Sequence, residues 1–198
     1  MLSNNIEKLQ ELGKKTYFTT ADVAQKFGLL PASARVFCSR YAQNGLLIRL
    51  KNNFYTTAGQ WENLTRNDMF KIANILQVPS YVSLTSALAY YEVTTQAQGN
   101  YQESICLKRS VSYNVRDAVF KYYKLQRQYY FDFVKIGGIF VATKEKAFVD
   151  AVYLFSFGKY KFDYSALDLK KLDKKRLDSL LKTYPAKTKE MVKRLCKT

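Results

Sequence analysis

The chain of 198 residues is 47% hydrophobic and 15% aromatic, which excludes a disordered chain and suffices for one large domain or two small ones. Its 32 Lys and Arg outnumber 16 Asp and Glu, and the net charge of +16 favours a polyanionic partner such as nucleic acid, the alternative being a merely solvated lysine surface. No histidine occurs, which excludes the commonest general base, the commonest metal ligand and every Ser-His or Cys-His nucleophile.

Common motifs of catalysis, metal binding and membrane insertion are also missing. The sequence has no CxxC pair, no GxxxxGK[ST] loop and no GxGxxG turn, so we expect no catalytic residue, no metal and no cofactor. An enzyme that acts through carboxylates alone stays open as a third hypothesis. Three widely spaced cysteines exclude a disulfide scaffold, and no apolar run approaches the roughly 20 residues that span a bilayer. Because MLSNNIEKLQ lacks a signal-peptide core, we expect a cytoplasmic protein without membrane contact.

Residues 1–60 predict three helices followed by a β-hairpin. An apolar stripe over residues 6–12 predicts the first helix. Thr19 or Thr20 caps the second helix, which ends at a glycine, and Pro31 suits the first turn of the third helix, where its missing N–H has no partner to lose.

The third helix divides its residues between a core face and an outer face. Ala34, Cys38 and Tyr41 recur at positions i, i+4 and i+7, so they are expected to pack inward. The outer face carries Ser33, Arg35, Val36, Ser39 and Arg40.

The sequence LLIRLKNNFYTT predicts a hairpin with strands over residues 46–50 and 54–56. Its polar turn at residues 51–53 contains two asparagines, which tolerate the positive φ of tight turns. Two helices, a turn, a third helix and a hairpin with a basic tip follow one another in this order in a winged helix-turn-helix, which we predict for residues 1–60.

In that fold the third helix enters the major groove of double-stranded DNA, where Arg35 and the rest of its outer face would read base edges. The hairpin and the loop after the first helix would hold phosphates, which position the protein but do not specify sequence. The residues expected in this second role are Lys14, Lys15, Arg49, Lys51, Asn52 and Asn53. The alternative is a winged helix used for protein–protein contact alone, with solvated arginines.

Residues 61–198 predict a separate α+β domain, so the fold class of the whole chain is α+β. Helical spacing recurs over residues 66–77, 84–91 and 144–155 and in two C-terminal segments. Four runs rich in Tyr, Phe and Val predict strands, which cover residues 103–109, 118–126, 129–136 and 138–143.

Three features of this region bear on function. Glu145 and Asp150 stand five residues apart and share no helix face, while Lys146 and Asp150 are expected to form a surface ion pair. The runs FKYYKL and RQYYFDF interleave basic and aromatic residues. This pattern makes an RNA-binding module with a basic aromatic sheet surface the alternative function of the protein. The same pattern also fits a sheet with one buried and one solvated face. Residues 159–198 carry 13 basic and 5 acidic residues, a surplus of 13 − 5 = +8 that suits phosphate contact or a solvated helical face.

Two short motifs, in YVSLTSALAYYEV after the hairpin and in VATKEKAFVDAVYL after the last predicted strand, are similar to motifs of a known family. The chain resembles the AbiEi antitoxins of type IV toxin–antitoxin systems, which are linked to abortive phage infection in bacteria. The resemblance covers residues 18–155, with Glu92 where the family usually has Gly. The residues that match are Ser83, Ser86, Ala87, Leu88, Ala142, Glu145, Lys146, Ala147 and Asp150.

The resemblance implies a transcriptional regulator that represses its own operon through the winged helix. It also implies that the C-terminal domain counteracts a nucleotidyltransferase-like toxin without forming a stable complex with it. Operators built as inverted repeats would suit two copies of the protein on one site.

Overall fold

The computed structural model describes residues 2–96 and 99–196, and the chain divides into two compact units, Met1–Ile72 (unit 1) and Ala73–Thr198 (unit 2). Both units contain helices and a sheet, so the predicted α+β class is confirmed. The predicted domain boundary lies between residues 60 and 61, whereas the structure divides the chain after Ile72, within helix α5 (Arg66–Leu76).

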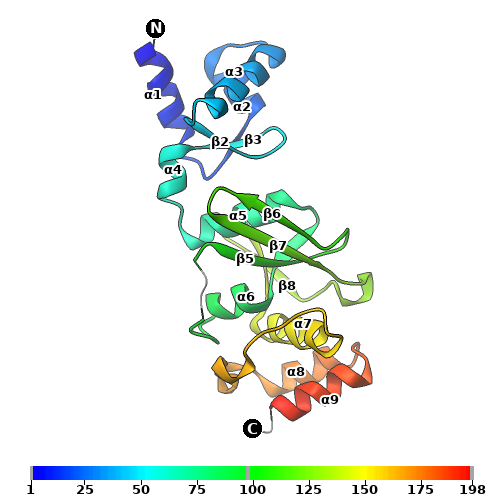
Figure 1. Cartoon of the computed structure of the whole chain (residues 1–198). Helices are drawn as coiled ribbons and strands as arrows, with labels where there is room; N and C mark the ends of the chain where they lie inside the picture. The colour runs from blue at the N-terminus through cyan, green and yellow to red at the C-terminus, as the bar shows by residue number, and fades with distance from the viewer. Residues whose placement is uncertain (1, 97–98, 197–198) are drawn as a thin grey trace. The chain divides into compact units, whose positions relative to one another are not determined.

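Unit 1 contains a three-stranded sheet in the order β1-β3-β2, with antiparallel pairing throughout (Figure 1). Pairing of Phe18 with Tyr55 joins the short first strand to the hairpin. The elements before α5 are α1 (Leu2–Leu12), β1 (Phe18–Thr19), α2 (Thr20–Phe27), α3 (Pro31–Gln43), β2 (Leu47–Lys51), β3 (Phe54–Thr57) and α4 (Ala58–Glu62).

Local signals fix where α2 begins and ends and where α3 begins. Thr19 and Asp22 form a capping box, in which the Asp22 amide donates to the Thr19 hydroxyl at 3.2 Å and the Thr19 amide donates to the Asp22 carboxylate at 2.7 Å. Gly28 ends α2 at φ 65°, a left-handed conformation that a side chain disfavours, and Pro31 opens α3. The predicted cap and the predicted start of α3 are confirmed.

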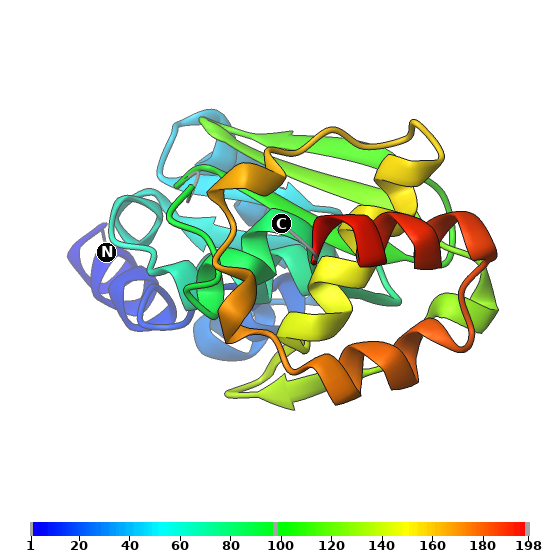
Figure 2. The same cartoon turned by 90° about the horizontal axis from the view of Figure 1, so that it is seen from below.

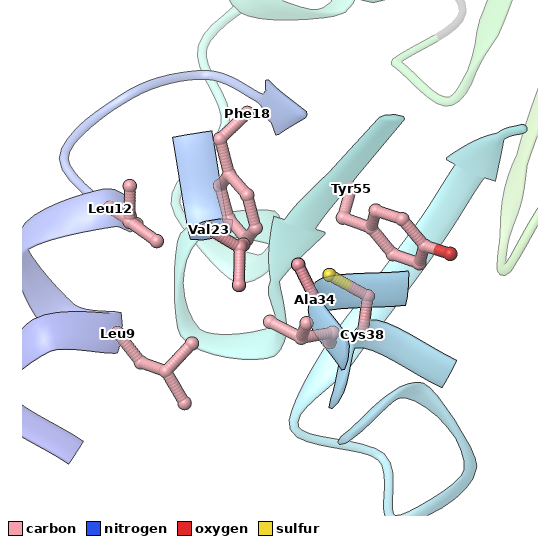
Figure 3. Close-up of a cluster of buried hydrophobic side chains, with 8 residues drawn as sticks. Leu9, Leu12, Phe18, Val23, Ala34, Cys38 and Tyr55 are labelled. Carbon is pink, nitrogen blue, oxygen red and sulfur yellow. The ribbon is translucent and has the colours of Figure 1, made fainter. Parts of the chain in front are cut away.

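A cluster of buried side chains joins all parts of unit 1 before α4 (Figure 3). Ala34 and Cys38 of α3 are fully buried, and the ring of Tyr55 from β3 packs in the same cluster. The three helices and the hairpin therefore bury their apolar faces against one another, which is the arrangement that the helical spacing predicts. The cluster consists of Leu9, Leu12, Phe18, Val23, Ala34, Cys38, Leu47 and Tyr55.

Unit 2 is built on a six-stranded mixed sheet with the strand order β6-β7-β5-β4-β9-β8. Its strands are β4 (Ser80–Val82), β5 (Tyr101–Cys106), β6 (Val111–Val115), β7 (Ala118–Lys124), β8 (Phe133–Ile136) and β9 (Ile139–Ala142). Its α-helices after the end of α5 are α6 (Leu84–Tyr90), α7 (Lys144–Ser156), α8 (Lys174–Leu181) and α9 (Ala186–Leu195).

Both faces of this sheet are covered. On one face, the Tyr122 hydroxyl donates to the Ala73 carbonyl oxygen at 2.5 Å and the Tyr113 hydroxyl donates to the Gln77 side chain at 3.1 Å. On the other face, α6 and α7 pack on the strands, and α8 and α9 pack against α7 (Figures 1 and 2). A strand that is covered on both sides needs no alternation of apolar and polar residues, which explains why the buried central strands β4 and β5 do not alternate.

The strand predictions for 103–109 and 118–126 correspond to β5 and β7 with shifted ends, and larger differences occur in three other segments of unit 2. Residues 111–115 and 80–82 form strands that the sequence interpretation left out, because the first is half polar and the second has only three residues. The predicted strand 129–136 begins four residues later, since a 3-10 helix occupies Arg127–Tyr129 and Asp132 takes a positive φ of 57°.

Candidate nucleic-acid interface

The outer face of α3 is exposed as predicted. Its five residues are all solvent-exposed, with 58% of Val36 accessible, whereas Ala34 and Cys38 on the opposite face are fully buried. Within the part of the chain that the structure describes, the side chains of Arg35 and Arg40 make no hydrogen bond or ion pair. Two guanidinium groups with all their donors directed to solvent are therefore available to an external acceptor. The five residues are Ser33, Arg35, Val36, Ser39 and Arg40.

The tip of the hairpin is organised by contacts among its own polar residues. The Arg49 guanidinium donates to the Asn52 side-chain oxygen at 3.2 Å, and Asn53 takes the positive φ of 64° that the turn requires. The Lys51 ammonium lies 4.5 Å from the centroid of the Phe54 ring. The predicted turn is confirmed, and both basic side chains at the tip contact a neighbouring residue of the hairpin.

Tyr55 connects the hairpin to α3. It pairs with Arg49 across the two strands, and its ring lies in the buried cluster beside Cys38 (Figure 3). Burial raises the pKa of the Tyr55 hydroxyl, while the nearby Arg49 charge opposes the shift. The strand that carries Arg49 is thus held to the inner face of the helix that carries Arg35.

Lys14 and Lys15 follow α1, and both are exposed. The Lys15 ammonium pairs with Asp22 at 3.0 Å. Burial raises the pKa of the Asp22 carboxyl, but hydrogen bonds from Thr19 and Lys15 outweigh it and lower the pKa to about 2. An exposed ion pair of this kind contributes about 0–1 kcal/mol, so a phosphate could compete for Lys15.

An open cleft of about 370 Å³ lies beside this pair and adds a cation that the sequence interpretation missed. Lys71 of α5 lines the cleft, with its ammonium 3.3 Å from Asp68. No sequence signal identifies Lys71, because its proximity to Lys15 depends on the tertiary fold. The lining residues are Lys15, Thr16, Tyr17, Phe18, Thr19, Asp22 and Lys71.

Unit 2 contains a buried charged network that contradicts the predicted surface ion pair. Lys146 and Asp150 form an ion pair on α7, and both side chains are 0% exposed. The Lys146 ammonium also donates to the hydroxyls of Tyr81 at 3.0 Å and Tyr184 at 2.9 Å, while Tyr81, Ser83 and Tyr184 all donate to Asp150. The prediction was wrong because the two residues stand in KAFVDAVYLF, a part of α7 that is apolar on nearly all sides and hence buried.

Aromatic rings surround the Lys146 ammonium. The ring centroids of Tyr81, Phe131 and Tyr184 lie 5.5, 5.4 and 5.7 Å from it. Burial lowers the pKa of Lys146, and the Asp150 charge opposes this shift. A network that is fully enclosed holds elements of the fold together and does not present a reactive group to a dissolved substrate.

Several motif residues that carry the family resemblance make structural contacts in and around this network. Ser83, Lys146 and Asp150 belong to it. The Ser86 hydroxyl accepts from the Glu103 amide at 2.9 Å, and the buried Glu145 carboxylate accepts from the Asp173 amide at 3.0 Å. Glu145 and Asp150 thus have separate partners, in agreement with their spacing.

Substitution of Lys146 by Met tests whether the Lys146–Asp150 ion pair is buried. Lys146→Met leaves the Asp150 carboxylate buried without its counter-ion, so we expect a loss of about 3–5 kcal/mol in the free energy of unfolding, measured by urea denaturation. The double variant Lys146→Met/Asp150→Leu removes both charges and should recover much of that loss. A loss of about 1 kcal/mol or less for the single variant would indicate the surface pair instead.

Glu103 of β5 is a second buried carboxyl group in unit 2. It is 4% exposed and accepts a hydrogen bond from the Tyr160 hydroxyl at 2.7 Å. Thr85 lies 2.7 Å from the same hydroxyl. Burial raises the pKa of Glu103 to about 7, although the hydrogen bonds oppose the shift. The folded protein therefore retains this proton at pH values where the unfolded chain has lost it.

The free energy of unfolding should consequently fall as the pH rises from 4.5 to about 7. The contribution of Glu103 is complete below the unfolded pKa near 4.5 and decreases up to pH 7, by roughly 3 kcal/mol at most, since one pKa unit corresponds to about 1.4 kcal/mol. Glu103→Gln should remove this part of the dependence when free energies of unfolding are compared between pH 5 and pH 8. The exposed variant Glu190→Gln is the control, and equal pH slopes for wild type and Glu103→Gln would contradict the assignment.

Several aromatic residues of the proposed RNA platform are buried inside unit 2. Phe120 and Tyr122 are at most 1% exposed, and Tyr129 is 7% exposed. Tyr123 packs edge-on against Tyr160, with ring centroids 5.3 Å apart. The buried rings of Phe120, Tyr122 and Tyr129 cannot stack on bases in the folded protein, whereas Tyr123, Tyr130, Phe131 and Phe133 are half-buried.

Among the described residues, no group of three or more Cys, Asp or Glu side chains is arranged to hold a metal ion. Within the same residues, no helix has both the length and the apolar character needed to cross a membrane.

No protein-family model matches the chain, and no match to a curated protein was found. The structure is similar to the crystal structure of the Rv2827c protein from Mycobacterium tuberculosis, with a TM-score of 0.62 and 11% sequence identity. The similarity covers 94% of this chain and 74% of the mycobacterial chain. At this identity the likeness concerns the fold alone.

Proposed function

We propose that the protein is a DNA-binding transcriptional regulator, in which unit 1 acts as a winged helix-turn-helix. The observation that carries the proposal is the outer face of α3, where Arg35 and Arg40 are exposed and have no partner among the described side chains. Arginine donates two parallel hydrogen bonds to guanine in the major groove, and such a contact discriminates against other bases by about 1–3 kcal/mol.

The order of elements in unit 1 supports this proposal. The order α1-β1-α2-α3-β2-β3, with β1 paired to β3, is the one expected of a winged helix, in which α3 would be the recognition helix and the hairpin the wing. The wing contributes Arg49 and Lys51 beside Asn52 and Asn53, which suits contact with phosphates next to the groove. The net charge of +16 adds attraction to any duplex.

The antitoxin role rests on the resemblance to the AbiEi family. We propose that the protein represses its own operon from inverted-repeat sites and that unit 2 counteracts a nucleotidyltransferase-like toxin without a stable complex. The family motifs in unit 2 contribute to the buried Lys146–Asp150 network and to contacts beside it, so their support for this role is indirect. A winged helix used for protein contact alone is the competing function, and it would leave the arginines of α3 without a ligand.

Duplex binding tests the proposal directly. The wild-type protein should bind the duplex immediately upstream of its own gene more tightly than a scrambled duplex, in fluorescence anisotropy at roughly 50 and 200 mM salt, with both affinities falling as salt rises. Arg35→Ala should lose about 1–3 kcal/mol of the preference between the duplexes. Lys51→Ala should weaken both duplexes equally and reduce the slope of log K against log salt by about 1.

The matched control is Arg116→Ala, which removes an exposed arginine from unit 2 and should leave the preference intact. Equal binding of both duplexes by the wild type would contradict sequence-specific regulation. A preference that survives Arg35→Ala would show that Arg35 does not read a base of the upstream duplex.

A further inference from the structure

The C-terminal helices of unit 2 carry a basic surface that none of the roles above uses. Between Lys174 and Arg194 the chain has eight Lys or Arg and two Asp or Glu. The leucines of α8 and the side chains of Val192 and Leu195 in α9 are buried, which directs the charged residues of both helices to solvent. The α8–α9 surface is formed by the exposed cations Lys174, Lys175, Lys182, Lys187, Lys193 and Arg194.

The cations of the α8–α9 surface form no ion pairs in the part of the chain that the structure describes, although Asp178 and Glu190 are exposed on the same helices. Within the described residues, none of the six makes an ion pair or a side-chain hydrogen bond, and the one cation–π contact places the Lys187 ammonium 5.2 Å from the Phe157 ring. Arg176, on the same helix as Lys174, pairs with Asp132 at 2.8 Å and with Glu145 at 3.8 Å, and it is therefore outside this surface. A cluster of unpaired like charges is unfavourable by itself, and a polyanion would relieve the repulsion.

The residue types of the α8–α9 surface indicate which class of partner it would bind. The exposed residues of α8 and α9 are charged or small, with no exposed aromatic or large aliphatic side chain. Protein interfaces are depleted in Lys and are anchored by aromatic residues, and helices that lie on membranes need an exposed apolar face. The apolar faces of α8 and α9 are instead packed in unit 2 against α7 (Figure 2).

We propose that the α8–α9 surface binds the phosphate backbone of a nucleic-acid duplex without reading its sequence. Lysine ammonium groups on flexible stems suit point contacts with phosphates, and each contact releases condensed counter-ions. Lys187 and Arg194 are seven residues apart on one helix, about 10 Å along its axis, so successive cations of α9 span several phosphates of a duplex. This role goes beyond operator recognition by α3, because it belongs to unit 2 and confers no sequence preference.

The test uses the full-length chain with four surface lysines replaced by glutamine. This variant should bind a random-sequence duplex more weakly than the wild type. The slope of log K against log salt should decrease by about 0.9 for each phosphate that is no longer neutralised, hence by about 1–4 in total. The preference of the variant for the upstream duplex over a scrambled one should remain unchanged. The substitutions are Lys175→Gln, Lys182→Gln, Lys187→Gln and Lys193→Gln.

A control variant removes the same number of charges from exposed lysines elsewhere in unit 2. It changes the net charge equally but should keep the wild-type salt slope if the contacts are local to α8 and α9. Circular dichroism spectra that match the wild type establish that both variants fold. The control substitutions are Lys108→Gln, Lys124→Gln, Lys159→Gln and Lys161→Gln.

The outcomes separate this proposal from operator recognition. Wild-type affinity and slope in the α8–α9 variant, or an equal loss in the control variant, would overturn the α8–α9 surface as a duplex site. So would a loss confined to phosphatidylserine vesicles or to poly-glutamate, which would indicate a membrane or an acidic protein as the partner. A wild-type protein without preference for the upstream duplex would contradict operator recognition alone, and the α8–α9 variant would still report on its own surface.

Discussion

Burying the Lys146 ammonium and the Asp150 carboxylate is costly unless the surrounding groups satisfy the remaining donors and acceptors. Tyr81 and Ser83 supply this from the region of β4, and Tyr184 supplies it from the segment that joins α8 to α9. The network therefore requires the sheet, α7 and the C-terminal segment to be assembled together. The α8–α9 surface depends on it, because Tyr184 is the residue through which the segment between these helices joins the network.

Unit 1, in contrast to unit 2, has no charged side chain in the buried cluster of its described residues. Its buried cluster is apolar apart from the Tyr55 hydroxyl and the Cys38 thiol, and burial raises the pKa of that thiol to about 11. Helix α3 contributes Ala34 and Cys38 to this cluster. Arg35 and Arg40 are positioned by the helix that carries them and are not engaged by the core, which leaves their guanidinium groups available to an outside acceptor.

The parts of the structure that sequence reasoning anticipated are those set by local chemistry. Spacing at i, i+4 and i+7 identifies the buried face of α3, and the two asparagines identify the hairpin turn, because both signals act within a few residues. The partners of the buried Lys146 ammonium could not be derived in this way, since Tyr81 and Tyr184 lie 65 and 38 residues away. The same holds for Glu103, whose environment includes Tyr160 at a separation of 57 residues.

The cations of this chain differ in whether they have a carboxylate partner. Lys15, Lys71, Lys146 and Arg176 each have a carboxylate partner and contribute to the fold or to its surface pairs. The arginines of α3 and the six cations of the α8–α9 surface have none among the described residues. Unpaired like charge adds nothing to the stability of the fold, and the proposals above assign these two sets of positions to nucleic acid. The two sets differ in kind: α3 offers arginine forks suited to base edges, whereas the C-terminal helices offer mainly lysines suited to phosphates.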